Sequence, residues 1–203
     1  MHEILSSVRS KALVAQRRAE IAGAALGLFR NKGFKSTSVE EVATQLRIDK
    51  ATLYGYISKK EDLLYLVFQH YVPAYTTRLE TAASSFEDPL ARLDALIVEQ
   101  IRIIDESPEF VLLTYRELRH LHHEAVGSVL EMIRANHAPF ERAIQDGIDA
   151  GLLVPIEPAI ATHALLSMLH MWAAQFWDLE RFGVESVSQA ARRIFFKGVA
   201  RDG

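Results

Sequence analysis

A short run of polar and aromatic residues, from Lys50 to Tyr56, has the composition of a surface that contacts another molecule. Leu53 and Ile57 are four residues apart, so on a helix they share one face and are expected to pack inward. The other side chains then lie on the outer face. Amine, hydroxyl and phenol groups there can form hydrogen bonds with another molecule. The outward residues are Lys50, Ala51, Thr52, Tyr54, Gly55 and Tyr56.

Capping residues predict where this helix and the one before it begin. Ser38 is followed three residues later by Glu41, which is the spacing of a capping box. Asp49 precedes Lys50 and is expected to cap the second helix, because its carboxylate can accept a backbone N–H that lacks an intrahelical partner. The first helix buries apolar residues at helical spacing, namely Val39, Val42, Ala43 and Leu46.

A tight turn at Arg47-Ile48 joins the two helices, and a third helix follows at once. Ser58 and Glu61 repeat the capping-box spacing and predict its start. Two short helices joined in this way, with a polar outer face on the second, form a helix-turn-helix. The second helix of that motif fits the major groove of DNA.

The stretch from Ile21 to Leu63 resembles the DNA-binding domain of TetR-family transcriptional regulators. The matching residues keep the family's spacing without interruption. They are Ala24, Ala25, Leu28, Phe29, Gly33, Phe34, Thr37, Ser38, Val39, Ile48, Lys50, Thr52, Leu53, Tyr54, Tyr56, Lys60, Glu61 and Leu63.

Five positions depart from the family's usual pattern, and those in the second helix leave open which DNA sequence is read. Arg47 stands where the family usually has glycine or an alanine-type residue in the turn. The other departures are Asp49 for serine, Ala51 for glycine, Ile57 for phenylalanine and Lys59 for serine.

The resemblance implies a DNA-binding site made of two groups of residues. One group reaches the bases: Lys50 and Thr52 at base edges, and Ala51 at a thymine methyl. The other group holds phosphates or sugars or completes the surface: Thr37, Ser38, Tyr54, Gly55, Tyr56 and Lys60.

Charge is distributed unevenly along the 203 residues. The first 62 carry 11 Lys and Arg against 7 Asp and Glu, a net charge of +4, whereas the rest carry 12 against 19, a net charge of −7. A basic N-terminal part suits a polyanion. The chain has no cysteine, which excludes disulfides, thiolate metal sites and a cysteine nucleophile. Its start lacks an apolar stretch of signal-peptide length, so we expect a cytoplasmic protein.

Apolar residues recur at helical spacing through the remainder of the chain, without useful strand alternation. Proline follows a capping residue at 88–89, 107–108 and 157–158, which predicts three helix starts. We expect an all-α fold of about nine helices. Residues 1–58 would form a helix-turn-helix DNA-binding domain, and residues 59–203 a helical ligand-binding and dimerisation domain.

The segment Pro158–Trp177 contains no charged residue over 20 positions, a length that can span a bilayer. Polar residues lie around it and no second such segment exists, which favours a helix buried on several sides over a membrane span. We expect it to form a four-helix interface in a two-fold dimer, as TetR-like regulators dimerise through their last two long helices. Its partners on the last helix would be Val187, Ala190, Ala191, Ile194 and Phe195.

No hydrolase, phosphate-loop or dinucleotide motif occurs in the chain, so we expect neither an enzyme nor a cofactor. Histidines leave a metal-responsive regulator open as an alternative, because imidazole and carboxylate suit zinc or nickel. The alternative is that these histidines bind no metal and are polar residues of the surface or of a pocket. The candidates are His120, His122, His123, Glu124, His163 and His170.

Aromatic, methionine and arginine residues in the C-terminal part are candidates for the wall of a ligand cavity, since such cavities are mostly apolar with a few polar groups. Any one of these residues could equally belong to an ordinary hydrophobic core without a cavity. The predicted ligand-binding residues are Phe110, Tyr115, Arg119, Phe140, Met168, Met171 and Trp172.

A second resemblance concerns the order of elements in this part, which is similar to the TetR subgroup that controls fatty-acid or sterol breakdown. Members of that subgroup sense acyl-CoA thioesters. The sequence thus predicts a dimeric repressor that binds a palindromic operator in double-stranded DNA and is released by a small molecule, with such a thioester as the first candidate. The alternatives are a metal-responsive regulator of the same fold and a helical enzyme that uses the cavity.

Overall fold

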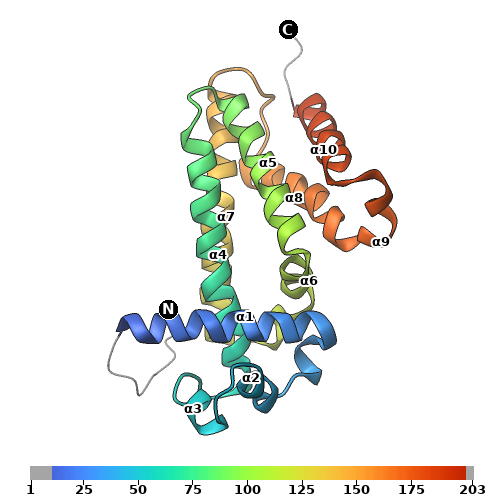
Figure 1. Cartoon of the computed structure of the whole chain (residues 1–203). Coiled ribbons are helices and arrows are strands. Elements are labelled where there is room, and N and C mark those ends of the chain that lie inside the picture. Colours follow the sequence, from blue (N-terminus) through green and yellow to red (C-terminus); the bar gives the residue numbers. More distant parts are fainter. Residues whose placement is uncertain (1–10, 200–203) are drawn as a thin grey trace. The chain divides into compact units, whose positions relative to one another are not determined.

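The computed structural model describes residues 11–199, which contain ten α-helices and no strand (Figure 1). The predicted all-α fold is confirmed. Two short 3-10 helices, over residues 118–120 and 180–182, follow α6 and α9. The α-helices are α1 (Lys11–Ser36), α2 (Val39–Gln45), α3 (Lys50–Tyr54), α4 (Lys60–Ser84), α5 (Pro89–Glu106), α6 (Pro108–Glu117), α7 (His123–Asp149), α8 (Pro158–Ala174), α9 (Phe176–Leu179) and α10 (Val184–Val199).

The chain divides into two compact units. The first comprises residues 1–74 and 113–133, and the second comprises residues 75–112 and 134–203. All three boundaries between the units fall inside helices, so α4, α6 and α7 each contribute to both units. The predicted division into residues 1–58 and 59–203 concerns function and stays a prediction.

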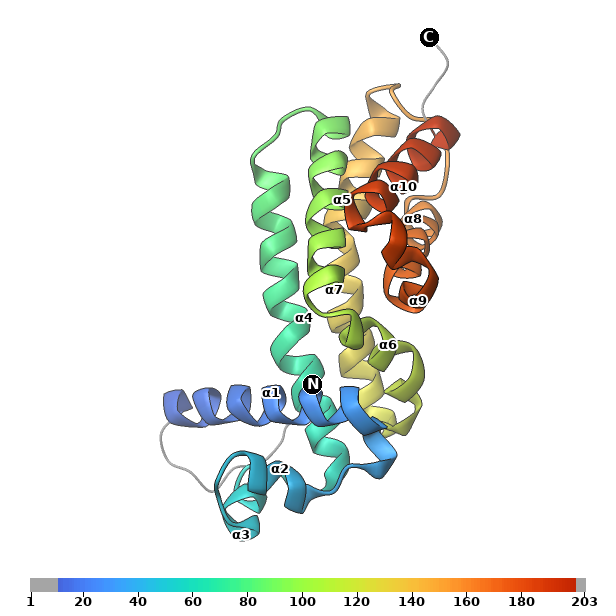
Figure 2. The ribbon, with the colours of Figure 1, turned by 45° about the vertical axis from the view of Figure 1, so that its right-hand side comes forward.

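The first unit is built around α1, with α2 and α3 on one side of it (Figure 2). Ile21, Phe29 and Leu53 are buried there. Gly33 has φ 81° and ψ 161°, a backbone conformation that side chains disfavour, and it interrupts the helical geometry of α1 near its end. The chain can therefore turn from α1 towards α2.

In the second unit, α8 packs on both α5 and α10, and α10 also packs on α5. Buried residues of these helices, together with Phe140 of α7, form one core. A backbone hydrogen bond of 2.8 Å from Val154 N to the Val199 carbonyl joins the segment before α8 to the end of α10. Within residues 11–199, no helix combines the length and the apolar character needed to cross a membrane.

The expected partner-facing side of α10 is wrong in part. Val187, Ala191 and Phe195 are buried within the unit itself. Ala190 and Ile194 instead lie on the exposed side, and Ile194 is 64% exposed. The sequence showed an apolar stripe but not how much of it the chain's own core uses.

The turn between α2 and α3 is a Schellman motif, in which backbone N–H groups satisfy the last carbonyls of a helix. Ile48 N bonds the Ala43 carbonyl at 3.0 Å, and Arg47 N bonds the Thr44 carbonyl at 3.1 Å. This motif needs a left-handed residue, and Arg47 supplies it with φ 56°. Among the described residues, Arg47 is the one non-glycine with positive φ.

We predict that Arg47→Gly raises the free energy of unfolding by about 1 kcal/mol, because glycine adopts this conformation without the clash of a Cβ atom. Urea unfolding followed by circular dichroism measures the change. Arg47→Ala is the matched control, since it removes the same side chain but keeps the Cβ. Equal stability of the two variants would show that the backbone at position 47 stores no strain.

Candidate nucleic-acid interface

The cap of α3 is formed by one carboxylate that binds Thr52 twice. Asp49 Oδ1 accepts the backbone N–H of Thr52 at 2.7 Å, and Asp49 Oδ2 accepts the Thr52 hydroxyl at 2.7 Å. These two hydrogen bonds, the hydroxyl first, lower the pKa of Asp49 below its usual value. The cap is therefore ionised at neutral pH, and the Thr52 oxygen keeps lone pairs to accept a further hydrogen bond.

The predicted capping box at α2 is confirmed. Ser38 Oγ accepts the Glu41 N–H at 3.2 Å, and Glu41 Oε2 accepts the Ser38 N–H at 2.8 Å. Lys32 of α1 also pairs with Glu41. The hydrogen bond from Lys32, followed by that from Ser38, lowers the pKa of Glu41 to about 2. The box and the ion pair attach the start of α2 to α1.

The outer face of α3 is exposed as predicted at Lys50, Ala51, Thr52 and Tyr54, and Gly55 is half-buried. The exposure expected for Tyr56 is wrong, because only 7% of it is accessible. Tyr56 comes after the last residue of α3, where the chain has left the helical spacing on which the prediction relied.

Thr37 is also buried, with 2% exposed. Its hydroxyl donates to the Gly33 carbonyl at 2.9 Å, so it stabilises the end of α1. Ser38 is half-buried and serves the capping box. The exposed part of the predicted DNA-binding site is thus centred on α3.

Lys50 lies on the exposed face of α3 and makes two contacts. It pairs with Glu40 of α2, and its Nζ lies 5.8 Å from the centroid of the Tyr54 ring. The Glu40 carboxylate raises the pKa of Lys50. The amine is therefore charged and held next to the phenol, with Glu40 as a partner that an incoming phosphate would replace.

Lys60 begins α4 and is also held in place. Its Nζ donates to the Lys35 carbonyl at 2.8 Å and lies 4.7 Å from the centroid of the Phe34 ring. The ammonium has three donors, so two remain for another acceptor. Lys60 is a fixed cation at the junction of α1 and α4.

The predicted capping box of Ser58 and Glu61 is wrong. Asp62 takes the role of the acid: its Oδ2 accepts the N–H of Ser58 at 2.7 Å and that of Lys59 at 3.2 Å. Only 3% of Asp62 is exposed. The capping-box rule assumes a helix that starts directly after the cap, whereas α4 starts two residues after Ser58.

Most of the predicted ligand-binding residues share the second unit. Phe140 and Trp172 are buried in its core, and Met168 and Met171 pack against that core. Trp172 Nε1 donates to Asp105 Oδ1 at 2.9 Å, which satisfies the indole N–H. The ring of Phe110 meets that of Tyr75 edge to face, with centroids 5.4 Å apart.

Tyr115 and Arg119 belong to the first unit and differ from the other five. Tyr115 is 65% exposed and Arg119 is exposed as well. The expectation that Tyr115 is part of an apolar wall is therefore wrong in this structure. Both residues lie close to the 3-10 helix over residues 118–120, where the spacing of an α-helix no longer predicts which side is buried.

Two histidines of the second unit, His137 and His170, are neutral rather than cationic at neutral pH. His137 of α7 and His163 of α8 have ring centroids 5.0 Å apart. Burial lowers the pKa of His137 and of His170 to about 4. Sequence analysis missed His137, whose only signal is its place among apolar residues of α7. No group of three or more His, Asp or Glu among the described residues is placed to hold a metal ion.

Comparison with known families accounts for both parts of the chain. Residues 21–66 match the model of bacterial regulatory proteins of the tetR family, and residues 87–198 match that of the tetracyclin repressor-like C-terminal domain. The chain belongs to the TetR family. The family and the relatives found are transcriptional regulators and not enzymes.

Individual relatives are distant. The HTH-type transcriptional regulator HbdR of Aromatoleum sp. (strain CIB) is 21% identical over 89% of this chain and 80% of its own length. Two solved structures share the fold. AibR in complex with isovaleryl coenzyme A and operator DNA has a TM-score of 0.77 and 22% identity, covering 88% of this chain and 97% of its own.

The second structure is FadR from Bacillus subtilis in complex with stearoyl-CoA, with a TM-score of 0.76 and 18% identity, covering 88% of this chain and 97% of its own. The predicted likeness to regulators that respond to acyl-CoA thioesters is thus confirmed at the level of the fold.

Proposed function

We propose that this TetR-family protein is a repressor that binds a near-palindromic operator as a dimer and is released by a small molecule. The observation that carries the proposal is α3, a short capped helix that exposes an amine, a hydroxyl and a phenol next to one another. Two such helices related by a two-fold axis enter successive major grooves, so half-sites are expected about one turn or more apart.

Base and phosphate contacts are divided between two sets of residues in this proposal. Lys50, Thr52 and Ala51 lie on α3 and read base edges, with the Thr52 oxygen as an acceptor because its proton is donated to Asp49. Tyr54, Gly55 and Lys60 contact the backbone. Thr37, Ser38 and Tyr56 position these residues from inside the unit, consistent with their lower exposure.

The proposed dimer forms through α8 and α10 of the second unit. Ile160 of α8 and Ile194 of α10 are 65% and 64% exposed. Ala164 and Ala190, each four residues from one of these isoleucines on the same helix, are exposed as well. Exposed isoleucines with small neighbours let two helix pairs approach closely, and burying them removes apolar surface from water.

The proposed effector is an acyl-CoA thioester that inserts its acyl chain into the core of the second unit. The core there contains adaptable methionines, Met168 and Met171, beside the rigid rings of Phe140 and Trp172. The complexes of AibR with isovaleryl coenzyme A and of FadR with stearoyl-CoA support this choice of ligand class. The effector can lower DNA affinity only by binding the DNA-incompetent state more tightly.

Lys60→Ala is predicted to weaken binding to every DNA sequence tested and to reduce the slope of log K against log salt by about 1 unit, because one phosphate contact is lost. Fluorescence anisotropy with operator and unrelated DNA at several salt concentrations gives both quantities. Lys60→Met keeps the alkyl chain near Phe34 and is expected to show the same slope. Lys59→Ala is the control at the neighbouring position. If it reduces DNA affinity and the salt slope as much as Lys60→Ala does, Lys60 has no specific role in phosphate binding.

Ile194→Asp is predicted to convert the dimer into a folded monomer, since it places a charge at the proposed interface while position 194 is exposed within the chain. Analytical ultracentrifugation measures the mass, and circular dichroism confirms that helix content is retained. Leu152→Asp changes another exposed apolar residue in the same way and should leave the dimer intact. A wild-type protein that sediments as a monomer would contradict the interface and the palindromic operator together.

The effector is tested by titrating the protein–operator complex with acyl-CoA species of increasing chain length, which we expect to release the DNA. Met168→Trp adds volume to the core and is predicted to abolish release while operator affinity without effector is unchanged. Met168→Leu conserves volume and should respond like the wild type. Failure of every thioester to release wild-type protein would overturn the effector but leave operator binding unaffected.

A further inference from the structure

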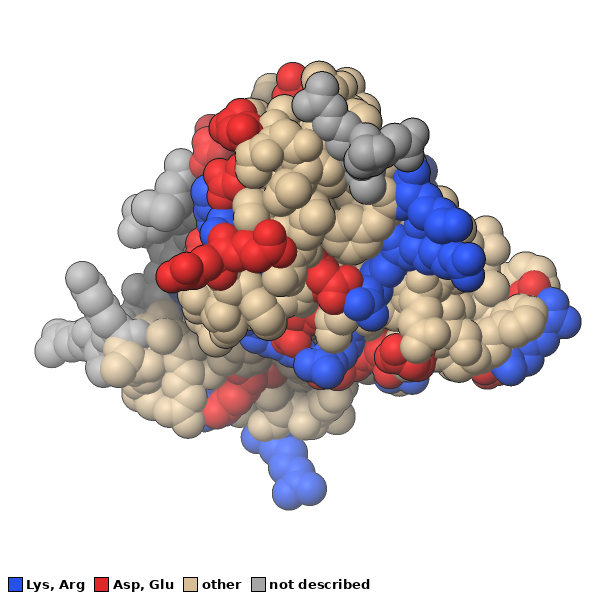
Figure 3. All heavy atoms as spheres, turned by 90° about the horizontal axis from the view of Figure 1, so that it is seen from above, with Lys and Arg blue, Asp and Glu red and all other residues tan. Residues whose placement is uncertain are grey.

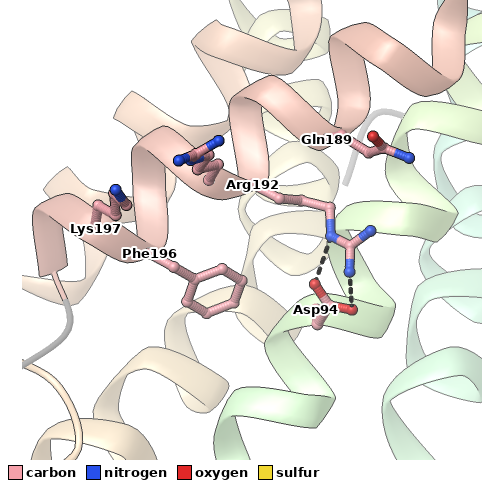
Figure 4. A pocket seen from close by; sticks show the side chains of 6 residues that line it. Asp94, Gln189, Arg192, Phe196 and Lys197 are labelled. Carbon is pink, nitrogen blue, oxygen red and sulfur yellow. Dashed lines mark hydrogen bonds and ion pairs between the residues drawn. The ribbon is translucent and has the colours of Figure 1, made fainter.

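A small open pocket lies between α5 and α10 of the second unit, and the proposed function does not use it. Its volume is about 310 Å³. Figure 4 shows Arg192 and Phe196 projecting from α10 on the side of Asp94, which belongs to α5. The lining residues are Asp94, Gln189, Arg192, Arg193, Phe196 and Lys197.

The pocket has an excess of positive charge. Arg192 and Asp94 neutralise each other through two hydrogen bonds, of 2.6 Å from Nε and 2.5 Å from Nη2 (Figure 4). Arg193 and Lys197 are exposed and form no ion pair with another described residue. They are four residues apart on one helix face, an arrangement in which like charges repel and a bound anion relieves the repulsion.

Separation of charge is also visible on the molecular surface. Figure 3 shows a group of Lys and Arg side chains in blue, apart from the largest red group of Asp and Glu but with a smaller red group beside it. Arg193 and Lys197 attract an anion to the pocket, and acidic side chains nearby, Asp94 among them, weaken this attraction.

Two further side chains offer the pocket contacts beyond those that a bare phosphate uses. Phe196 is half-buried, with one part packed against the core of the unit, and the remainder of its ring offers an apolar surface to the pocket. Gln189 donates its Nε2 to Glu185 at 2.9 Å, so its carbonyl oxygen remains able to accept a hydrogen bond. An aromatic surface, an amide acceptor and two cations suit a ring that carries an amino group and phosphates.

We propose that this pocket binds a mononucleotide, with its phosphates on Arg193 and Lys197 and its base against Phe196. A volume of about 310 Å³ is at the lower limit for small-molecule sites, so it suits a base with its phosphates and not a long acyl chain. Around α10, Phe196 lies about 160° from Ile194, whereas Lys197 lies on the same side as Ala190, at the edge of the proposed dimer face. The nucleotide is either free or the nucleotide end of a coenzyme A ester.

Isothermal titration calorimetry of the full chain with ATP and with adenosine 3′,5′-bisphosphate tests the site. We expect saturable binding of one or both, weakened by salt because the cations are exposed. Arg193→Ala/Lys197→Ala should weaken binding by about tenfold or more, since two charge-assisted hydrogen bonds are lost. Arg134→Ala/Arg142→Ala removes the same charge from exposed positions of α7 and should leave binding unchanged.

Two single variants separate a built site from general attraction between charges. Asp94→Asn removes the carboxylate that occupies Arg192 and is expected to tighten nucleotide binding several-fold. Phe196→Leu keeps an apolar side chain on the core but removes the aromatic face, so it should weaken nucleotide binding and leave binding of inorganic phosphate unaffected.

The nucleotide that binds more tightly identifies the source. Preference for adenosine 3′,5′-bisphosphate, with competition by coenzyme A, indicates an ester of the coenzyme, whereas preference for ATP indicates a free nucleotide. Absence of saturable binding, or binding that Arg193→Ala/Lys197→Ala and the α7 control change equally, overturns the proposal. These outcomes are independent of operator binding and release, so failure here does not bear on the proposed repressor function.

Discussion

The exposed helix α3 has five residues, too few to be stable by itself, and everything that it presents depends on the burial of Leu53 and Ile57. Neither side chain is more than 1% accessible. Fixing a single turn costs backbone entropy that one hydrogen bond does not offset, so the packing of these two residues within the first unit supplies the difference. Asp49 then fixes the start of the helix, and Arg47 accepts a strained backbone so that the helix can begin where it does.

Lys50 and Lys60 interact with their partners to different extents. The difference decides how easily a DNA phosphate can replace each partner. Lys50 pairs with Glu40, which is exposed, and exposed pairs are worth little because water and salt screen them. An incoming phosphate can take the place of Glu40 at small cost. Lys60 instead donates to a backbone carbonyl and rests on Phe34, so its position is fixed before any ligand arrives. One cation is exchangeable and the other is preorganised.

Local rules predicted the parts of the structure that local chemistry decides. The capping box of Ser38 and Glu41 and the cap at Asp49 are properties of a few consecutive residues, and both were predicted correctly. The second box failed because Asp62 lies within reach of the same N–H groups once α4 begins one residue later than expected. Spacing alone cannot choose between neighbouring carboxylates that compete for one donor.

Helical periodicity predicted side-chain exposure wrongly near the ends of helices. It also could not decide whether an apolar stripe packs against the chain's own core or against a partner subunit. Tyr56 and Tyr115 lie next to the ends of α3 and α6, and their exposure was predicted wrongly in opposite directions. On α10, Val187, Ala191 and Phe195 follow the apolar pattern as Ile194 does, but only tertiary packing decides that the first three belong to the chain's own core. The half-buried His137 had no sequence signal beyond its apolar surroundings.

Coupling between the two units has a covalent route through α4, α6 and α7, since each of these helices contributes residues to both. Pro73 lies in α4 just before the division between residues 74 and 75. Proline removes a backbone hydrogen bond of the helix and crowds the preceding turn, so α4 resists bending least at this point. A ligand that binds the second unit can change the first only if its binding free energy differs between two arrangements of these helices. Bending α4 at Pro73 distorts fewer backbone hydrogen bonds than bending a helix without proline, which favours this position for such a change.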